Sequence, residues 1–229
     1  MDALWCVIPA AGKGVRAGGD RPKQYQHVAG RPLLDHTLER LAAHPLIAGL
    51  MVVIAADDTH FASIDQVRGK PLLTTVGGSE RSYSVLAGIE ALPDSVGPDA
   101  FVLVHDAARP CVRADDITRL VSEAGQREGG LLGAPLRDTL KRSDAAGHSA
   151  ETEPRDGRWR AFTPQMFRRA ELARALRLAA GAGIVVSDEA MAIERAGGKP
   201  LLVEGSEDNI KVTTPADFAL AEFLLGRTK

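Results

Sequence analysis

Short runs of apolar residues alternate along this chain with segments whose apolar residues repeat at the helical period. The runs are bounded by Gly, Pro or Asp and cover residues 4–8, 50–55, 72–76, 101–105 and 131–134. Continuous apolar runs are typical of strands that are covered on both faces, as in a parallel sheet. The helical repeats lie between the runs, at 34–42, 85–92 and 117–124. This alternation predicts an α/β sandwich with a mostly parallel sheet.

The composition fits one globular domain over residues 1–229. Hydrophobic residues make up 45% of the chain, which is enough for a full core. The net charge of −2 gives no general attraction for nucleic acid, so an anionic ligand must meet a local cluster of cations. We expect no membrane span and no targeting signal, because the chain has no long apolar run and no basic amino-terminal flank. Neither Cys6 nor Cys111 belongs to a CxxC pair, so a reducing, cytoplasmic setting is expected.

The first predicted strand leads into a loop of small residues that two cations follow. The loop is Pro9-Ala10-Ala11-Gly12, it continues to Gly14, and the cations are Arg16 and Lys23. Small residues let main-chain amides approach phosphates, and the cations can neutralise a polyphosphate. A tight turn with two solvated cations is the alternative interpretation.

The same loop satisfies the loose pattern GxGxxA of dinucleotide-binding sites from Gly12 to Ala17. In such sites the loop opens directly into a helix whose amino end holds the pyrophosphate. Here Gly18-Gly19-Asp20-Arg21-Pro22 blocks helix propagation, and Asp35, the acidic residue at the ribose-binding distance, falls inside a predicted helix. The sequence therefore favours a polyphosphate site over a nicotinamide cofactor site.

Three further segments place reactive side chains at a strand end or a helix start. Asp106 and Arg109 follow an apolar run, at the sheet edge where α/β proteins bind ligands. An Asp there can hold a magnesium ion or a sugar hydroxyl. Gly78, followed by Ser84, allows close approach of a nucleobase, and Lys211 can meet a phosphoryl group in transfer. Each has an ordinary alternative as a turn residue, a helix cap or a solvated cation.

The last predicted helix begins near residue 214. Thr214 can cap it, and Pro215 fits its first position. Phe218, Ala221 and Leu225 form an apolar stripe that the helix must bury. We expect this helix to pack back on the sheet.

Residues 142–158 contain almost no large apolar side chain. Their scattered charges, with Pro154 and Gly157, favour a flexible surface loop, because the segment cannot bury itself. The alternative is an arm that leaves the domain and is ordered by a second subunit, with residues 138–141 and 159–162 as possible paired strands. Composition alone favours the loop.

Taken together, the motifs resemble one family closely, the 2-C-methyl-D-erythritol 4-phosphate cytidylyltransferases. The likeness spans nearly the whole chain in the family's order, with matching segments at 9–16, 22–25, 77–85, 105–110, 137–139 and 208–211. Its most specific parts are His105-Asp106-Ala107-Ala108-Arg109-Pro110 and Asp208-Asn209-Ile210-Lys211-Val212-Thr213. The resemblance implies a Rossmann-like three-layer sandwich of the nucleotidyltransferase type with a protruding β-arm.

The resemblance implies transfer of CMP from CTP to 2-C-methyl-D-erythritol 4-phosphate, in the non-mevalonate route to isoprenoid precursors. The products would be 4-CDP-2-C-methyl-D-erythritol and pyrophosphate. Magnesium is the implied metal, held mainly by the CTP phosphates, with Asp106 as the one candidate protein ligand. The substrate phosphate attacks the α-phosphorus in line, so no covalent nucleophile is needed. A cytidylyltransferase for another polyol phosphate, such as ribitol 5-phosphate, and a non-catalytic nucleotide-binding module stay open as alternatives.

Carried over from the family, the site residues divide into three groups. The implied catalytic residues are Arg16, Lys23, Arg155 and Lys211. The implied CTP-binding residues are Pro9, Ala10, Ala11, Gly12, Gly14, Arg16, Lys23, Gly78, Ser84 and Asp106. The residues implied to bind the polyol phosphate are Asp106, Arg109, Thr139, Arg155, Thr163 and Lys211.

The resemblance also implies that residues 138–160 form an arm that makes a homodimer and carries Thr139 and Arg155 to the neighbouring active site. This reverses the preference for a loop, and it rests on the resemblance alone. The chain departs from the family's pattern here, because Glu153-Pro154 precedes Arg155 and Arg158 stands where an apolar residue is more usual. Arg158 is therefore the alternative to Arg155.

Overall fold

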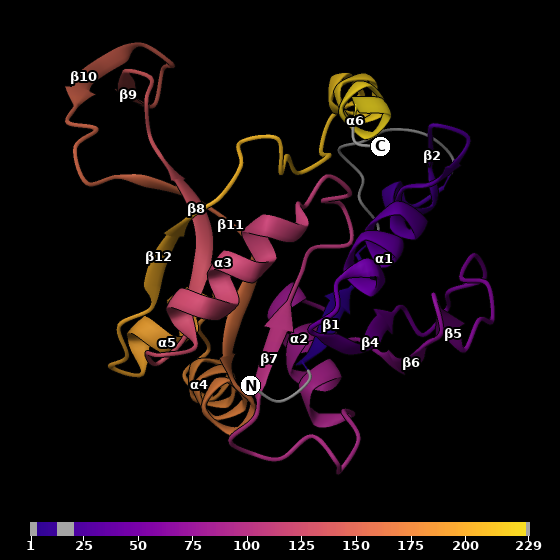
Figure 1. Cartoon of the computed structure of the whole chain (residues 1–229). Coiled ribbons are helices and arrows are strands. Elements are labelled where there is room, and N and C mark those ends of the chain that lie inside the picture. Colours follow the sequence, from indigo (N-terminus) through magenta and orange to yellow (C-terminus); the bar gives the residue numbers. More distant parts are fainter. Residues whose placement is uncertain (1–3, 13–20, 228–229) are drawn as a thin grey trace.

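The computed structural model describes residues 4–12 and 21–227, and an eight-stranded sheet runs through this part of the chain (Figure 1). In spatial order its strands are β12 (Leu201–Glu204), β8 (Gly130–Pro135), β11 (Trp159–Arg168), β7 (Phe101–Val104), β1 (Leu4–Pro9), β4 (Ile47–Ile54), β6 (Lys70–Val76) and β5 (Gln66–Val67). Neighbouring strands are parallel, except that β11 is antiparallel to β7 and β8, and β5 to β6. The mostly parallel sheet is confirmed, and β1, β4, β6, β7 and β8 overlap the five apolar runs.

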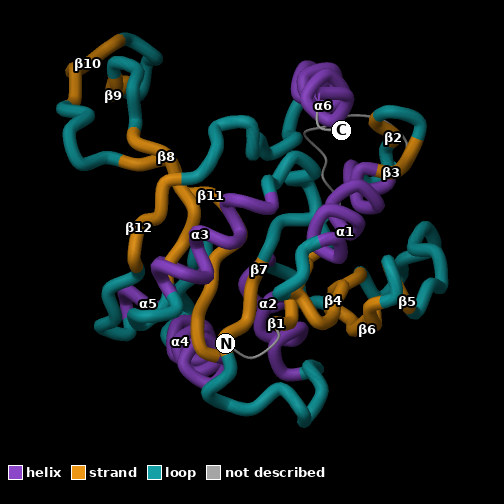
Figure 2. The backbone as a smooth tube through the Cα atoms, viewed as in Figure 1, coloured by secondary structure: helices purple, strands orange, loops and turns teal. Residues whose placement is uncertain are grey.

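Helices cover both faces of the sheet and complete three layers (Figure 2). One face carries α1 (Leu33–Ala43) and α3 (Ala114–Ala124), and the other carries α2 (Arg81–Glu90), α4 (Arg169–Gly181) and α5 (Glu189–Arg195). The sandwich is confirmed, although α4, α5 and β12 have no counterpart among the predicted elements. None of the helices in the described ranges is long and apolar enough to cross a membrane.

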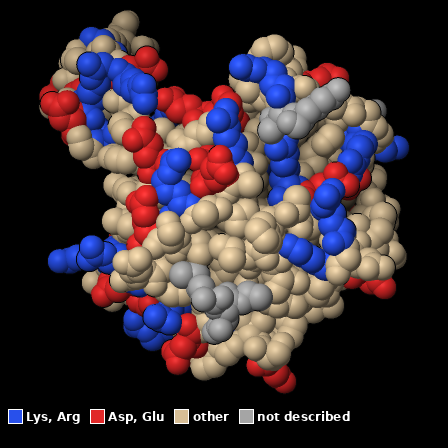
Figure 3. Space-filling view, in the orientation of Figure 1, with Lys and Arg blue, Asp and Glu red and all other residues tan. Residues whose placement is uncertain are grey.

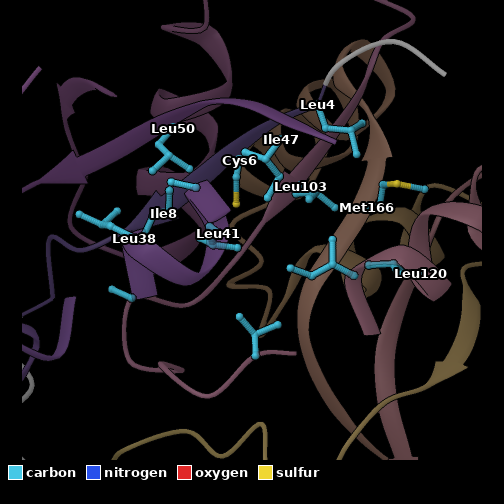
Figure 4. Close-up of a cluster of buried hydrophobic side chains, with 14 of the residues drawn as sticks. Leu4, Cys6, Ile8, Leu38, Leu41, Ile47, Leu50, Leu103, Leu120 and Met166 are labelled. Carbon is cyan, nitrogen blue, oxygen red and sulfur yellow. The ribbon is translucent and has the colours of Figure 1, made fainter. Parts of the chain in front are cut away.

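Strand β1 shows why a central strand is a continuous apolar run. Cys6 and Ile8 point into the core beneath α1 and α3, where Ile8 lies near Leu38 and Leu41 (Figure 4). Val7 points to the opposite core, beneath α2 and α4. Since successive side chains of a strand alternate between the two faces, burial of both faces leaves no position for a polar residue.

The arm is a local hairpin of β9 (Leu140–Ser143) and β10 (Ser149–Glu153) that projects from the sandwich (Figure 1). Asp144 Oδ1 closes the turn by accepting hydrogen bonds from the main-chain N–H groups of Ala146 (2.9 Å) and His148 (2.8 Å). Gly147 supplies the positive φ, 86°, that the turn requires. The protruding β-arm is confirmed, and the preference for an irregular loop from composition is wrong.

The pairing expected between residues 138–141 and 159–162 is wrong. β9 pairs with β10, whereas residues 159–161 pair with β8 in the main sheet. A partner that lies a few residues away costs less loop-closure entropy than one that lies twenty residues away, and the Asp144 turn brings β10 to β9 at that short distance. Residues 159–168 therefore enter the sheet as β11.

The carboxyl-terminal helix α6 (Pro215–Arg227) packs beside the sheet rather than on it. It adjoins the hairpin of β2 (His27–Val28) and β3 (Arg31–Pro32) in a separate small core of Val28, Leu33, Ala108, Cys111, Val212, Ala221 and Leu224. The expectation that it packs on the sheet is wrong, because the other helices occupy both faces. The segment before α6 is tied to the loop after β7 by a hydrogen bond from Val212 N to Ala108 O (2.9 Å).

Candidate active site

A pocket of about 280 Å³ opens at the carboxyl ends of β1 and β7, beside the start of α2. It is lined by predicted CTP-site residues and by Lys211: Pro9, Ala10, Ala11, Gly12, Lys23, Gly78, Ser84, Asp106 and Lys211. Because β1 and β7 are parallel neighbours, the loops that follow them leave the sheet at the same edge. Gly14 and Arg16, also predicted for this site, lie outside the described residues.

A second pocket of about 200 Å³ adjoins the first. The two share Arg81, Asp106 and Lys211, which therefore stand at their boundary. The second pocket brings in Arg109 and Thr163, the two remaining predicted residues outside the arm that the structure describes. Two adjoining spaces with cations between them suit two anionic ligands that must meet.

Close approach of two loops explains the small residues in the first pocket. A Cβ atom at Gly77 would lie 2.6 Å from Ser84 Oγ and 2.8 Å from Ala11 Cβ, so only glycine fits. Gln24 Nε2 donates hydrogen bonds to the carbonyl oxygens of Ala10 (2.6 Å) and Gly12 (3.0 Å). These contacts fix the main chain around the pocket, a role for Gln24 that no local motif predicted.

Lys23 is carried by the short 3-10 helix η2 (Lys23–Tyr25) and reaches across the pocket edge. Its Nζ donates a hydrogen bond to Val212 O (2.9 Å), in the segment before α6. Tyr25, two residues on, is anchored by a hydrogen bond from its hydroxyl to Asp58 Oδ2 (2.6 Å). The Pro-Lys-Gln-Tyr segment thus holds its lysine between two loops of the sheet edge.

Asp106 is buried amid three cations. Its Oδ1 lies 3.0 Å from Arg81 Nε, and its Oδ2 lies 2.9 Å from Lys211 Nζ and 3.3 Å from Arg109 Nε. Burial raises the pKa of the Asp106 carboxyl, but the charges of the three cations outweigh burial and hold this pKa far below its usual range. The carboxylate is therefore ionised, and it orients cations instead of transferring protons.

Arg81 and Glu189 belong to the site, although the sequence predicted a role for neither side chain. Arg81 Nη1 lies 2.6 Å from Glu189 Oε1, and Nη2 lies 3.3 Å from Oε2. Burial raises the pKa of the Glu189 carboxyl, and the Arg81 charge opposes this rise. Arg81 belongs to a segment that carries the family resemblance, whereas Glu189 lies in α5, for which the sequence analysis predicted no element.

His105 ties the loop after β7 to β11. Its Nε2 lies 3.0 Å from Arg109 O, and its Nδ1 lies 3.1 Å from Thr163 Oγ1, which accepts a hydrogen bond from Asp106 N (3.0 Å). Burial lowers the pKa of the His105 imidazole to about 4, so the ring is neutral at pH 7. Nε2–H therefore donates to Arg109 O, and the Thr163 hydroxyl donates to Nδ1. Thr163 holds the Asp106 loop as well as lining the second pocket.

The two arm residues predicted for the site are not brought to it within one chain. Of the described residues that line the two pockets, none comes from the arm. Thr139 and Arg155 are exposed, and Arg155 Nη1 donates to Arg137 O. Arg158 Nε donates to Pro154 O (2.8 Å), and its Nη2 lies 3.2 Å from Glu153 Oε2. Arg155 thus contacts the residue just before the arm, and Arg158 contacts residues of the arm itself.

The donor set offers little for a metal held by protein alone. Within residues 4–12 and 21–227, no group of three or more His, Cys, Asp or Glu side chains is placed to hold a metal ion. Both oxygens of Asp106 are in ion pairs. Mg²⁺ is commonly bound by one or two carboxylates together with substrate phosphates. Because both oxygens of Asp106 are already paired, an ion at this site would be held mainly by the substrate phosphates.

Known proteins resemble the chain over nearly all of its length. A model of the 2-C-methyl-D-erythritol 4-phosphate cytidylyltransferase family matches residues 4–227. The protein of that name from Stenotrophomonas maltophilia (strain K279a) is 56% identical over 227 residues, covering 98% of this chain and 97% of the relative. Its namesake from Xanthomonas campestris pv. campestris (strain B100) is 57% identical over 224 residues, covering 97% of this chain and 84% of the relative.

Solved structures share the fold. The crystal structure of 4-diphosphocytidyl-2C-methyl-D-erythritol synthase matches with a TM-score of 0.85 at 32% identity, covering 98% of this chain and 100% of the other. That of the Francisella tularensis 2-C-methyl-D-erythritol 4-phosphate cytidylyltransferase matches with a TM-score of 0.83 at 32% identity, covering 97% of this chain and 100% of the other. The nucleotidyltransferase-type sandwich is therefore confirmed by comparison as well as by topology.

Proposed function

This chain belongs to the 2-C-methyl-D-erythritol 4-phosphate cytidylyltransferase family, and we propose that its two adjoining pockets are where CMP is transferred from CTP to 2-C-methyl-D-erythritol 4-phosphate. The products are 4-CDP-2-C-methyl-D-erythritol and pyrophosphate, in isoprenoid biosynthesis. The observation that carries the assignment of the site is the boundary between the pockets, where Arg81, Lys211 and Arg109 surround one buried carboxylate.

The proposed step is one in-line displacement. An oxygen of the polyol phosphate forms a bond to the α-phosphorus of CTP, and the bond from that phosphorus to the oxygen bridging to the β-phosphate breaks. The electron pair of the broken bond leaves with pyrophosphate, and no covalent enzyme intermediate forms. Because both reactants are anions, the protein contributes mainly by positioning them and by stabilising the charge of the transition state.

The first pocket is proposed to hold CTP. Its small-residue loops let main-chain amides approach the nucleotide, and Lys23 stands at its edge to stabilise the departing pyrophosphate. Arg16, outside the described residues, is assigned the same task from the family resemblance. The second pocket is proposed to hold the polyol phosphate against Arg109, Thr163 and Lys211. Asp106 lines both pockets and is proposed to face either the magnesium ion or the polyol hydroxyls.

Magnesium is proposed to arrive with the nucleotide. Asp106 is the one protein ligand assigned to it, and the CTP phosphates supply the other ligands. When bound, the ion neutralises charge on the phosphates. We expect EDTA to abolish turnover and added Mg²⁺ to restore it.

The arm is proposed to act in a homodimer formed by one 229-residue domain per subunit. Its support is that Thr139 and Arg155, which the family resemblance assigns to the substrate, face neither pocket of their own chain. A partner's arm can then complete the second pocket. Light scattering tests this proposal, and a monomer at micromolar concentration contradicts it. A cytoplasmic location stays a prediction.

The experiment that tests the proposed function is a pyrophosphate-release assay with CTP and each candidate acceptor. We expect turnover with 2-C-methyl-D-erythritol 4-phosphate and much less with ribitol 5-phosphate. Faster turnover with ribitol 5-phosphate would favour the other polyol substrate. Release with neither acceptor, in a protein that still binds CTP, would favour the non-catalytic nucleotide-binding alternative.

A further inference from the structure

Arg81 stands at the boundary of the two pockets, yet its guanidinium is held by the protein. Its Nε contacts Asp106 Oδ1 (3.0 Å), and its two terminal nitrogens contact the two oxygens of Glu189 (2.6 and 3.3 Å). The two acids come from different elements, the loop after β7 and the first turn of α5. The rigid guanidinium fork therefore fixes these elements relative to one another.

Glu189 has no access to a substrate. It is 1% exposed and is not among the residues that line either pocket. Its place is fixed through Gln165 on β11, whose Nε2 donates to Asp188 Oδ2 (2.9 Å) and whose Oε1 accepts from Ala190 N (2.8 Å). Since a buried charge is costly unless it is paired, Glu189 acts on the site through Arg81.

The direction of the Asp106 carboxylate depends on this contact. Arg81 holds Oδ1, while Oδ2 faces Lys211 and Arg109 at the pocket boundary. The terminal torsion of an aspartate has a broad energy profile, so the side chain alone does not fix this orientation. Without Arg81, the carboxylate can turn, and Lys211 loses its fixed partner.

We propose that Arg81 and Glu189 form a positioning pair, in which Glu189 orients the Arg81 guanidinium and Arg81 orients Asp106. The inference rests on the proposed function of the pockets and adds two residues that the site assignment lacked. The pair keeps Lys211 and Arg109 aimed at the place where the two anions react. Neither member forms or breaks a bond in the reaction.

The test removes the pair as a unit, because removing one partner leaves a buried charge uncompensated. The double variant Arg81→Met/Glu189→Met replaces the ion pair by apolar side chains of similar length, a change that proteins commonly tolerate. The matched control is Glu90→Met/Arg177→Met. It removes an exposed ion pair between α2 and α4, with Arg177 Nη2 2.6 Å from Glu90 Oε1, and touches neither pocket.

We expect the pair variant to lose ~100-fold in kcat, as for a group displaced by about an ångström, while the control keeps wild-type turnover. The KM for CTP should change much less than kcat. A cycle with Asp106→Asn separates positioning from a general structural effect. If the pair acts through Asp106, removing it in the Asp106→Asn background costs little further turnover.

Two results would overturn the proposal: turnover of the pair variant close to that of the control, or a loss that adds in full to the loss of Asp106→Asn. If circular dichroism shows that the pair variant does not fold, Arg81→Lys takes its place, because lysine keeps the charge and lacks the fork. The same loss and the same non-additivity are expected, and full turnover overturns the proposal. An inactive wild-type protein contradicts the proposed function instead.

Discussion

The ion pairs at the pocket boundary and those on the arm have opposite surroundings. At the pocket, Asp106 is 6% and Glu189 1% exposed. On the arm, the Arg142 side chain is 59% exposed where it pairs with Glu151 and Glu153, and Figure 3 shows basic and acidic side chains interspersed over this projection. Exposed pairs contribute little to stability, whereas a buried charge that loses its partner costs much.

The fold fixes the positions of the charges at the pocket, but not of those on the arm. The pocket cations converge because strand ends and helix starts bring them to one sheet edge. The arm residues line neither pocket of their own chain, so the role proposed for Arg155 requires the proposed second subunit.

The largest effect is expected from Lys23→Ala. We expect turnover to fall by ~10²–10³-fold, because a charge that stabilises the leaving pyrophosphate is lost, while the melting temperature stays near that of the wild type. Steady-state pyrophosphate release and thermal melting measure the two quantities. Lys199→Ala, which removes an exposed lysine that lines neither pocket, is the control. Near-normal turnover of Lys23→Ala would remove Lys23 from the mechanism.

Buried His105 predicts a pH dependence of stability. Burial lowers its pKa from 6.5 to about 4, so between these values the unfolded chain binds a proton that the folded chain does not. Stability therefore falls as the pH drops from 6.5 toward 4, by ~3 kcal/mol for this group, and the loss levels off below pH 4.

Urea unfolding at pH 7 and pH 4.5 tests this dependence. His105→Gln, whose amide can still donate to Arg109 O, is expected to lose less stability over the interval than the wild type. His148→Gln, which removes an exposed imidazole from the arm turn, controls for the loss of one titratable side chain. Equal losses in the wild type and in His105→Gln would contradict the assignment.

A smaller effect separates Arg155 from Arg158. A charged hydrogen bond to the substrate phosphate contributes about 2 kcal/mol, so Arg155→Ala should lower kcat/KM for the polyol phosphate by ~30-fold and leave the KM for CTP nearly unchanged. Arg158→Ala should give near-wild-type kinetics, because Arg158 pairs with Glu153 on its own arm. The reverse result would give Arg158 the role.

Complementation tests whether the arm works on the neighbouring pocket. Arg155→Ala and Lys23→Ala chains are co-expressed, so that mixed dimers contain one pocket with an intact lysine and an intact partner arm. We expect turnover above that of either variant alone. No recovery in mixed dimers would show that each arm serves its own chain.

Much of the sandwich follows from local pattern. The apolar runs at β1, β4, β7 and β8 identify strands because both of their faces are buried, whereas in β6 only Leu72 is buried. β11 cannot be predicted in this way, because its first residues resemble the arm in composition. Its place between β7 and β8 depends on pairing with strands that are distant in the sequence. The position of α6 likewise depends on which faces the earlier helices leave open.

In the site, too, some residues can be predicted from local sequence and others depend on long-range contacts. Lys23, Asp106 and Lys211 stand at strand ends or before helices, so topology alone predicts that they share one edge. Glu189 could not be found this way, because its only signal is a long-range contact with Arg81. Buried partners that act through another side chain leave little trace in a local motif.

The smallest effect is expected from Arg142→Ala on the arm. Its pairs with Glu151 and Glu153 are exposed, so the free energy of unfolding should change by less than ~1 kcal/mol, and by less still at high salt. Arg81→Ala is the reference, because it leaves Glu189 buried without its partner and should cost ~3–5 kcal/mol. Urea unfolding of both variants measures the contrast directly. Equal losses of unfolding free energy would mean that ion pairs stabilise the arm as strongly as they stabilise the pocket, and that the arm is held in place within one chain.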